Sequence, residues 1–276
     1  MICLTADLHH MSLETGNQEH SDKTEMSLAG EFVKMMEKRN IKGSFFITGR
    51  SFKEEWHEVK PICDSPNIEI GGHTYEGFEP ALFHRIWNKL TKNYNGPFLY
   101  QYYDTKKTID IIKKKTGKKI NIWRNHMYMH GPNTEKVLYK LGIEVCSDGV
   151  KKDSYVLQKD ETGIYNLPIN IIPDHEHLIH AERTPEWIAQ WQERYNWSDD
   201  FGPDSYYIEE WTDMVIEQLK ANEAKNQLSV LIIHPITMYL ADKFESVQRI
   251  LDYIKDCETI FMGDLVKKEK LKESVL

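Results

Sequence analysis

Six apolar stretches of this 276-residue sequence each end in a side chain that can transfer a proton, hold a metal ion or bind a charged group. The stretches are far apart along the chain, and the residues that follow them are Asp7, His73, Arg124, Asp148, Asp174 and His234. A carboxylate and a histidine on opposite sides of a substrate can act as general base and general acid. The set therefore predicts hydrolytic chemistry, provided that the fold gathers these positions.

The stretch 67–75 shows this pattern most clearly. An apolar, strand-like run ends at Ile70, Gly71 and Gly72 follow, and His73 comes next. We expect the two glycines to let the backbone turn sharply and approach a ligand closely. His73 is then a candidate metal ligand just beyond the end of a strand.

The elements that must position these residues are strands that alternate with amphipathic helices along most of the chain. This alternation predicts an α/β fold with a mainly parallel sheet, and 276 residues leave room for one large barrel. The carboxyl ends of barrel strands meet on one face, where barrel active sites lie. We predict a single domain over residues 1–276, with insertions near 78–103 and 174–205. The aromatic residues of the first insertion could form a platform for a sugar ring or pack on the core.

Five segments, taken in order, resemble the motif series of the polysaccharide deacetylase superfamily (NodB homology, carbohydrate esterase family 4). Residues 5–7 (Thr-Ala-Asp) resemble its first motif, and residues 42–49 are similar to its second strand. Residues 69–75 match the approach to its His-Ser/Thr-x-x-His motif. Residues 123–124 (Trp-Arg) resemble its arginine motif, and residues 231–235 its last strand, which ends in histidine. The resemblance covers most of the chain and implies a distorted (β/α) barrel of the NodB-homology type, with mainly parallel strands.

The resemblance also implies a reaction. Members of this superfamily remove acyl groups from carbohydrates, with a divalent metal ion that polarises the acyl carbonyl and activates water. By position, Asp7 corresponds to the general base, Arg124 to the residue that orients it, His234 to the general acid and His73 to a metal ligand. Five nearby residues are predicted to contact the substrate: Tyr75, Trp123, Asn125, His126 and Asp148.

Two metal ligands of the family are missing from their usual positions. The aspartate that follows the base is Leu8 here, and the histidine four residues after the first one is Gly77. Mixed histidine and carboxylate ligands suit zinc or a similar transition metal. We therefore expect a rebuilt divalent-metal site, for which the candidate ligands are His73, His9, Glu76 and His175.

Three functions remain open at this level. The first is a hydrolase that removes an acetyl or other acyl group from a carbohydrate or sugar conjugate. The second is a barrel that has lost catalysis and only binds a glycan or a partner, as the changes at Leu8 and Gly77 would allow. The third is a hydrolase of a small non-sugar amide.

Composition limits the partners and the compartment. A net charge of −8 disfavours nucleic acid and anionic membranes as general partners, because both bind basic surfaces, although a local basic patch stays possible. Four cysteines without metal-type spacing suit a reducing compartment. No apolar stretch approaches the roughly 20 residues of a membrane span, and no signal sequence is recognisable. We expect a cytoplasmic protein that acts on a carbohydrate or a small acylated substrate, and its oligomeric state stays open.

Overall fold

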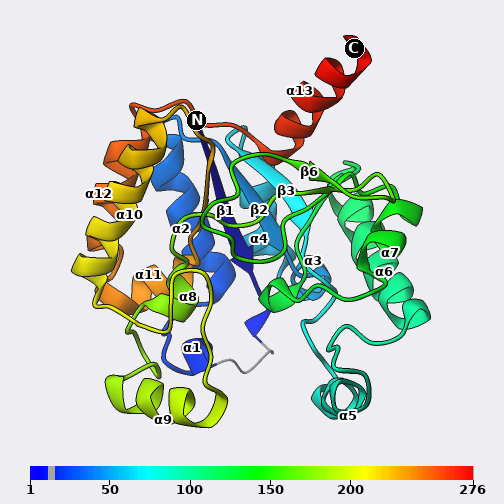
Figure 1. Cartoon of the computed structure of the whole chain (residues 1–276), viewed down its shortest axis with the longest axis horizontal. Coiled ribbons are helices and arrows are strands. Elements are labelled where there is room, and N and C mark those ends of the chain that lie inside the picture. The colour runs from blue at the N-terminus through cyan, green and yellow to red at the C-terminus, as the bar shows by residue number, and fades with distance from the viewer. Residues whose placement is uncertain (12–15, 276) are drawn as a thin grey trace.

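The computed structural model describes residues 1–11 and 16–275 of the chain. Within these residues, eight strands form one curled sheet that is surrounded by helices (Figure 1). The strands are β1 (Ile2–Leu8), β2 (Gly43–Ile47), β3 (Ile68–Gly72), β4 (Ile122–Trp123), β5 (Val145–Cys146), β6 (Gln158–Lys159), β7 (Tyr165–Asn166) and β8 (Ser229–Ile232). Their order in the sheet is β6-β7-β5-β4-β3-β2-β1-β8. All pairs are parallel except β6 with β7.

An irregular segment after β7 brings the two ends of the curl together. The Leu167 N–H donates to the Cys146 carbonyl of β5, and the Asn170 N–H donates to the Val230 carbonyl of β8, both at 3.1 Å. The predicted architecture, a distorted barrel of mainly parallel strands, is therefore confirmed. Because the central strands run in one direction, their carboxyl ends all lie at the same edge, the lower one in Figure 1.

Helices return the chain between parallel strands. The longer helix between β1 and β2 is α2 (Glu25–Glu37), and the Thr24 side chain caps it by accepting from the Ser27 N–H at 3.0 Å. The remaining helices are α1 (Gly16–Glu19), α3 (Gly49–Glu54), α4 (Trp56–Asp64), α5 (Ala81–Thr91), α6 (Phe98–Thr116), the 3₁₀ helix η2 (His126–Tyr128), α7 (Thr134–Lys140), α8 (Asp174–His177), α9 (Pro185–Tyr195), α10 (Ile208–Ala224), α11 (Pro235–Asp242), α12 (Glu245–Ile254) and α13 (Met262–Val275). None of the described helices is long and apolar enough to cross a membrane.

The two predicted insertions contain helices that extend beyond the carboxyl edge of the sheet. Figure 1 shows α5 of the first insertion and α9 of the second at the two lower corners of the molecule. Aromatic rings of the first insertion pack mostly on one another. The ring centroids of Phe83 and Tyr100 are 4.9 Å apart, and those of Phe78 and His84 are 5.2 Å apart. His84 is buried and its Nδ1 bonds to the Tyr94 carbonyl at 2.6 Å. These contacts favour internal packing over an open platform for a sugar.

Gly71 and Gly72 do not form the predicted sharp turn. Both belong to β3, and neither has a positive φ. A Cβ on Gly71 would lie 2.6 Å from the Phe46 ring, and a Cβ on Gly72 would overlap the Trp123 ring. The expectation of a turn was wrong, because these glycines make room for aromatic rings of the two neighbouring strands.

Substitution of Gly72 by alanine should lower the free energy of unfolding by about 1–3 kcal/mol, because the Trp123 ring is buried and has no space to move away. Gly30→Ala in α2 is the matched control, since a Cβ there meets nothing within 4 Å. Alanine is the better helix former, so this variant should match or exceed the native stability. Urea unfolding curves measure both, and equal stability of the two variants would contradict the packing argument.

Candidate active site

The predicted base, acid and metal ligand meet at one cavity. Asp7 lies near the end of β1, His73 directly follows β3, and His234 directly precedes α11. All three line a cavity of about 260 Å³ at the carboxyl edge of the sheet. The same cavity is also lined by His9, Glu25, His126, Tyr128, His175 and Glu176.

Arg124 lies beside Asp7 and is completely buried. Its Nη1 donates to Asp7 Oδ1 at 2.9 Å and to Thr5 Oγ1 at 3.0 Å. Its Nε and Nη2 donate to the Ser147 carbonyl and hydroxyl oxygens at 2.8 and 2.7 Å. The guanidinium therefore fixes the Asp7 carboxylate through one oxygen. The other oxygen, Oδ2, lies 3.8 Å from His73 Nε2, on the cavity side.

His73 presents an unprotonated nitrogen to the cavity. Its Nδ1 lies 2.9 Å from the Arg124 carbonyl oxygen. Because a carbonyl oxygen can only accept, Nδ1 carries the proton and Nε2 carries a lone pair. Burial, and then the neighbouring His9, hold the pKa of His73 well below its usual value of 6.5, which keeps the ring neutral.

His9 faces His73 with a second lone pair. Glu25, buried at the start of α2, accepts from the His9 backbone N–H at 2.8 Å and lies 3.1 Å from His9 Nδ1. The carboxylate thereby places the proton of a neutral His9 ring on Nδ1. The two Nε2 atoms are 3.1 Å apart. Two lone pairs at this distance repel each other unless a proton or a cation lies between them.

His126 completes a group of three histidines. Ligand atoms of His9, His73 and His126 all lie within 4.8 Å of one another. Burial, and then His9 and His73, lower the pKa of His126 well below its usual value. The two residues that follow, Met127 and Tyr128, both have a φ of 55°, which is rare outside glycine and marks strain of the kind found at functional sites. His126, predicted to contact the substrate, thus lies where it could hold a metal.

His234 is held by a different carboxylate. Its backbone N–H and its Nδ1 lie 2.6 and 2.7 Å from the two oxygens of Asp174, the first residue of α8. Burial lowers the pKa of His234, but the nearby carboxylates, Asp174 above all, together outweigh it and raise the pKa to about 9. A protonated His234 can therefore donate from Nε2 at neutral pH. His175 lies on this side as well, 5.5 Å from the His234 ring.

Two predicted residues lie away from the cavity lining. The Glu76 carboxylate pairs with Arg50 and is not among the described groups that could hold a metal. The Tyr75 ring lies under Lys107, whose Nζ is 3.2 Å from the ring centroid. Gly77 has a φ of 64°, so a histidine at the position of the missing family ligand would be strained.

Three others support the loop that carries His126. The Trp123 indole is buried in the core and donates to Asn125 Oδ1 at 2.9 Å. Asp148 accepts from the Asn125 N–H at 2.8 Å and from its side-chain amide at 2.7 Å. Asn125 directly precedes η2, so these bonds fix the start of the strained turn. In this structure none of the three lines the cavity itself.

Sequence reasoning missed the roles of the two carboxylates that orient histidines. Asp174 was singled out as a polar residue after an apolar stretch, but its pairing with His234, which is distant in sequence, was not predicted. Glu25 follows the helix cap Thr24, where acidic residues usually face solvent and complement the helix dipole. No pattern in the sequence distinguishes a buried Glu25 from an exposed one, since only the fold brings His9 beside it.

Comparison with known proteins relates this geometry to a family. Residues 22–146 match the family model described as polysaccharide deacetylase. A search of curated proteins finds no match. Among solved structures, the chain is similar to a presumed polysaccharide deacetylase from Mycobacterium smegmatis, with a TM-score of 0.68 and 14% identity over 99% of this chain and 90% of the other.

Two further structures share the fold. Puue allantoinase gives a TM-score of 0.65 with 11% identity over 96% of this chain and 88% of the other. A probable polysaccharide deacetylase from Pseudomonas aeruginosa PAO1 gives 0.61 with 12% identity over 96% and 89%. At identities of 11–14%, these three structures show a shared fold. Together, the family-model match and the shared fold confirm the resemblance to the polysaccharide deacetylase superfamily that the sequence motifs indicated.

Proposed function

We propose that this chain is a metal-assisted hydrolase that removes an acyl group, such as acetyl, from a carbohydrate or sugar conjugate. The observation that carries the proposal is the approach of His9 Nε2 and His73 Nε2 to 3.1 Å, beside the carboxylate of Asp7. The orientation of His234 by Asp174 on the same cavity supports it as well.

The donor set fits a divalent transition metal such as zinc. His9, His73 and His126 would hold the ion, in place of the family ligands lost at Leu8 and Gly77. A carboxylate or a carbonyl on the remote ring nitrogen is the usual support for histidine ligands, and Glu25 and the Arg124 carbonyl are so placed. When bound, the ion would supply Lewis acidity toward the acyl carbonyl and the attacking water.

The protein supplies the two proton transfers. Asp7, held by Arg124 through Oδ1, takes a proton from the attacking water through Oδ2. His234, kept protonated by Asp174, gives its Nε2 proton to the leaving nitrogen or oxygen. A carboxylate base and a histidine acid with separate partners can work in opposite directions at one pH. Because base and acid both keep their partners, we favour an active enzyme over an impaired barrel that only binds a glycan.

The size of the cavity favours a small substrate, and it makes a small non-sugar amide the second candidate substrate for the same class of reaction. Its volume of about 260 Å³ is small, because sites for drug-sized ligands usually span about 300–1,000 Å³. One acyl group with part of a single sugar ring fits it better than a polymer segment does. A small non-sugar amide would fit as well, and the allantoinase with this fold makes such a substrate worth assaying. Turnover of acetylated monosaccharides, acetylated oligosaccharides and allantoin separates these possibilities.

The purified chain should bind one zinc ion, and His9→Ala and His73→Ala should each weaken zinc affinity by at least about tenfold. Isothermal titration calorimetry with a competing chelator measures the affinity without reference to activity. His175→Ala is the matched control, because His175 lines the same cavity but lies outside the group of three histidines. Unchanged affinity in the His9 and His73 variants would exclude this metal site.

The two site carboxylates should have different kinetic signatures. Asp7→Asn removes the base and should lower kcat by about 10²–10⁴ at every pH. Asp174→Asn removes a charge that raises the pKa of His234. His234 should then lose its proton at a lower pH, so the alkaline limb of the pH–rate profile should shift to lower pH. Asp110→Asn, an exposed carboxylate on α6, serves as the control and should leave the pH–rate profile unchanged. Identical profiles for Asp174→Asn and the native chain would remove His234 as the acid.

A further inference from the structure

The exposed apolar surface is concentrated in the first insertion. Among the described residues, eleven large hydrophobic side chains are exposed, and five of them lie between positions 82 and 103. Their exposed fractions run from 52% to 75%. They are Leu82, Ile86, Leu90, Leu99 and Tyr103.

Three of these residues form one stripe on α5. Leu82, Ile86 and Leu90 are spaced four residues apart, so they lie on one side of the helix, and we call them the α5 stripe. Another side of α5 is anchored, because His84 is buried against Phe78. One side of α5 therefore packs against the rest of the insertion, while the α5 stripe is exposed to solvent in the monomer. Apolar patches of this kind mark interaction sites.

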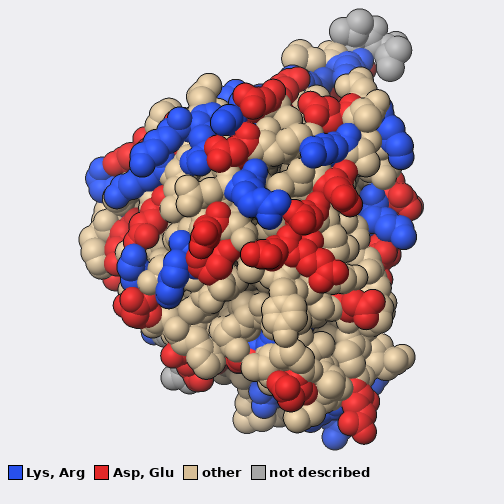
Figure 2. All heavy atoms as spheres, turned by 90° about the vertical axis from the view of Figure 1, so that its left-hand side faces the viewer, with Lys and Arg blue, Asp and Glu red and all other residues tan. Residues whose placement is uncertain are grey.

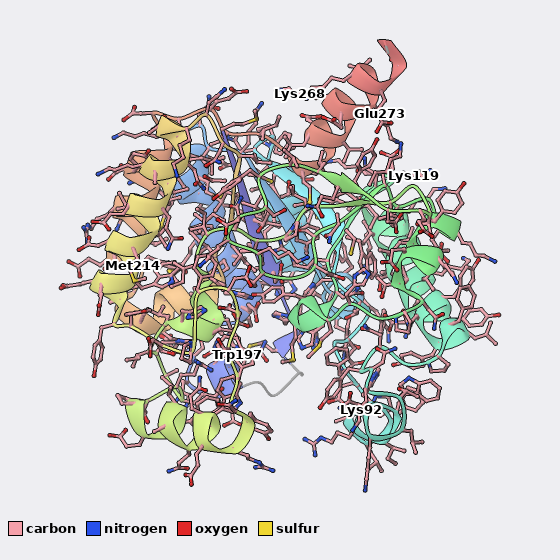
Figure 3. All side chains as sticks on the ribbon, viewed as in Figure 1. Lys92, Lys119, Trp197, Met214, Lys268 and Glu273 are labelled. Carbon is pink, nitrogen blue, oxygen red and sulfur yellow. The ribbon has the colours of Figure 1, made fainter. Side chains whose placement is uncertain are left out.

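The same segment is locally cationic on an acidic chain. Residues 80–103 include Arg85, Lys89 and Lys92 and no aspartate or glutamate, whereas the whole chain has a net charge of −8. Arg85 and Lys89 are exposed on α5, and Lys92 ends the helix at the lower right of Figure 3. The face of α10 and α12 differs, because acidic and basic side chains are interspersed on it (Figure 2).

These charges decide between two occupants of the stripe. In a symmetric dimer, the α5 stripes of two copies would face each other across a two-fold axis. Arg85 and Lys89 would then lie close to the same cations of the second copy. An anionic lipid surface has no such penalty. It accepts leucine and isoleucine side chains at the acyl boundary and attracts lysine and arginine at the headgroups.

We propose that α5 is an interfacial helix that docks the protein on an anionic membrane through the α5 stripe and its flanking cations. The helix lies at the carboxyl edge of the sheet, and Phe78 links it to His126 at 5.3 Å. Docking through α5 would hold the carboxyl edge of the sheet, where the cavity lies, close to the lipid surface. The negative net charge disfavours membranes as a general partner, and segment 80–103, which carries three cations and no acidic residue, is the local exception. This inference does not depend on the proposed catalysis.

Co-sedimentation with phosphatidylcholine vesicles, with and without phosphatidylglycerol, tests the proposal. The native chain should sediment with the phosphatidylglycerol vesicles and much less with phosphatidylcholine alone. The double variant Ile86→Asp/Leu90→Asp should lower the bound fraction at least about tenfold. Arg85→Gln/Lys89→Gln, which leaves the stripe intact, should lower it by about tenfold or more, with a loss that shrinks as salt increases.

Leu271→Asp is the matched control, because Leu271 is an equally exposed leucine (67%) on α13, outside the insertion. It should leave vesicle binding unchanged, and circular dichroism melting shows that each variant is folded. Absence of native vesicle binding would overturn the proposal, and so would equal losses in the Leu271 and stripe variants. A dimer in light scattering that the stripe variant abolishes, without vesicle binding, would assign the stripe to a second copy instead.

Discussion

The buried charge of Arg124 is the constraint on which this carboxyl edge depends. An arginine with no solvent exposure is tolerable only when its donors find acceptors, and an unpaired buried charge costs several kcal/mol. Here Thr5 and Asp7 of β1 and Ser147 next to β5 supply those acceptors around a side chain that follows β4. The barrel must therefore bring these three strand ends to fixed positions, and the cavity is built on top of them.

Arg124 serves both halves of the candidate chemistry at once. Its guanidinium holds Asp7, and its carbonyl oxygen fixes the tautomer of His73. His9 and His234 receive the same kind of support from Glu25 and Asp174. The rings of His9, His73 and His234 are thus each oriented by an acceptor from another part of the chain, which is how a protein keeps a small polar site rigid. Loss of one acceptor would release one ring while the others keep their positions.

The sequence predicts those features that depend on local pattern. Apolar runs of strand length predicted the parallel sheet, the motif series predicted the barrel, and the polar residues after the runs predicted Asp7, His73, Arg124 and His234 as neighbours. Features that depend on contact between distant segments were missed. Glu25 is buried beside His9 only because α2 packs under the end of β1, and His126 joins the histidines only through a turn with two left-handed residues. Gly71 and Gly72 were misread because the rings that require them belong to other strands.

The close contact between Gly72 and Trp123 has an evolutionary consequence. A side chain at 72 would overlap the Trp123 ring and lower stability unless a smaller residue stands at 123, and the same holds for Gly71 with Phe46. Among relatives with this barrel, substitutions at the members of each pair should therefore occur together. Such coupled columns would reveal the neighbouring strands β2, β3 and β4 even in sequences too divergent to align by their catalytic residues.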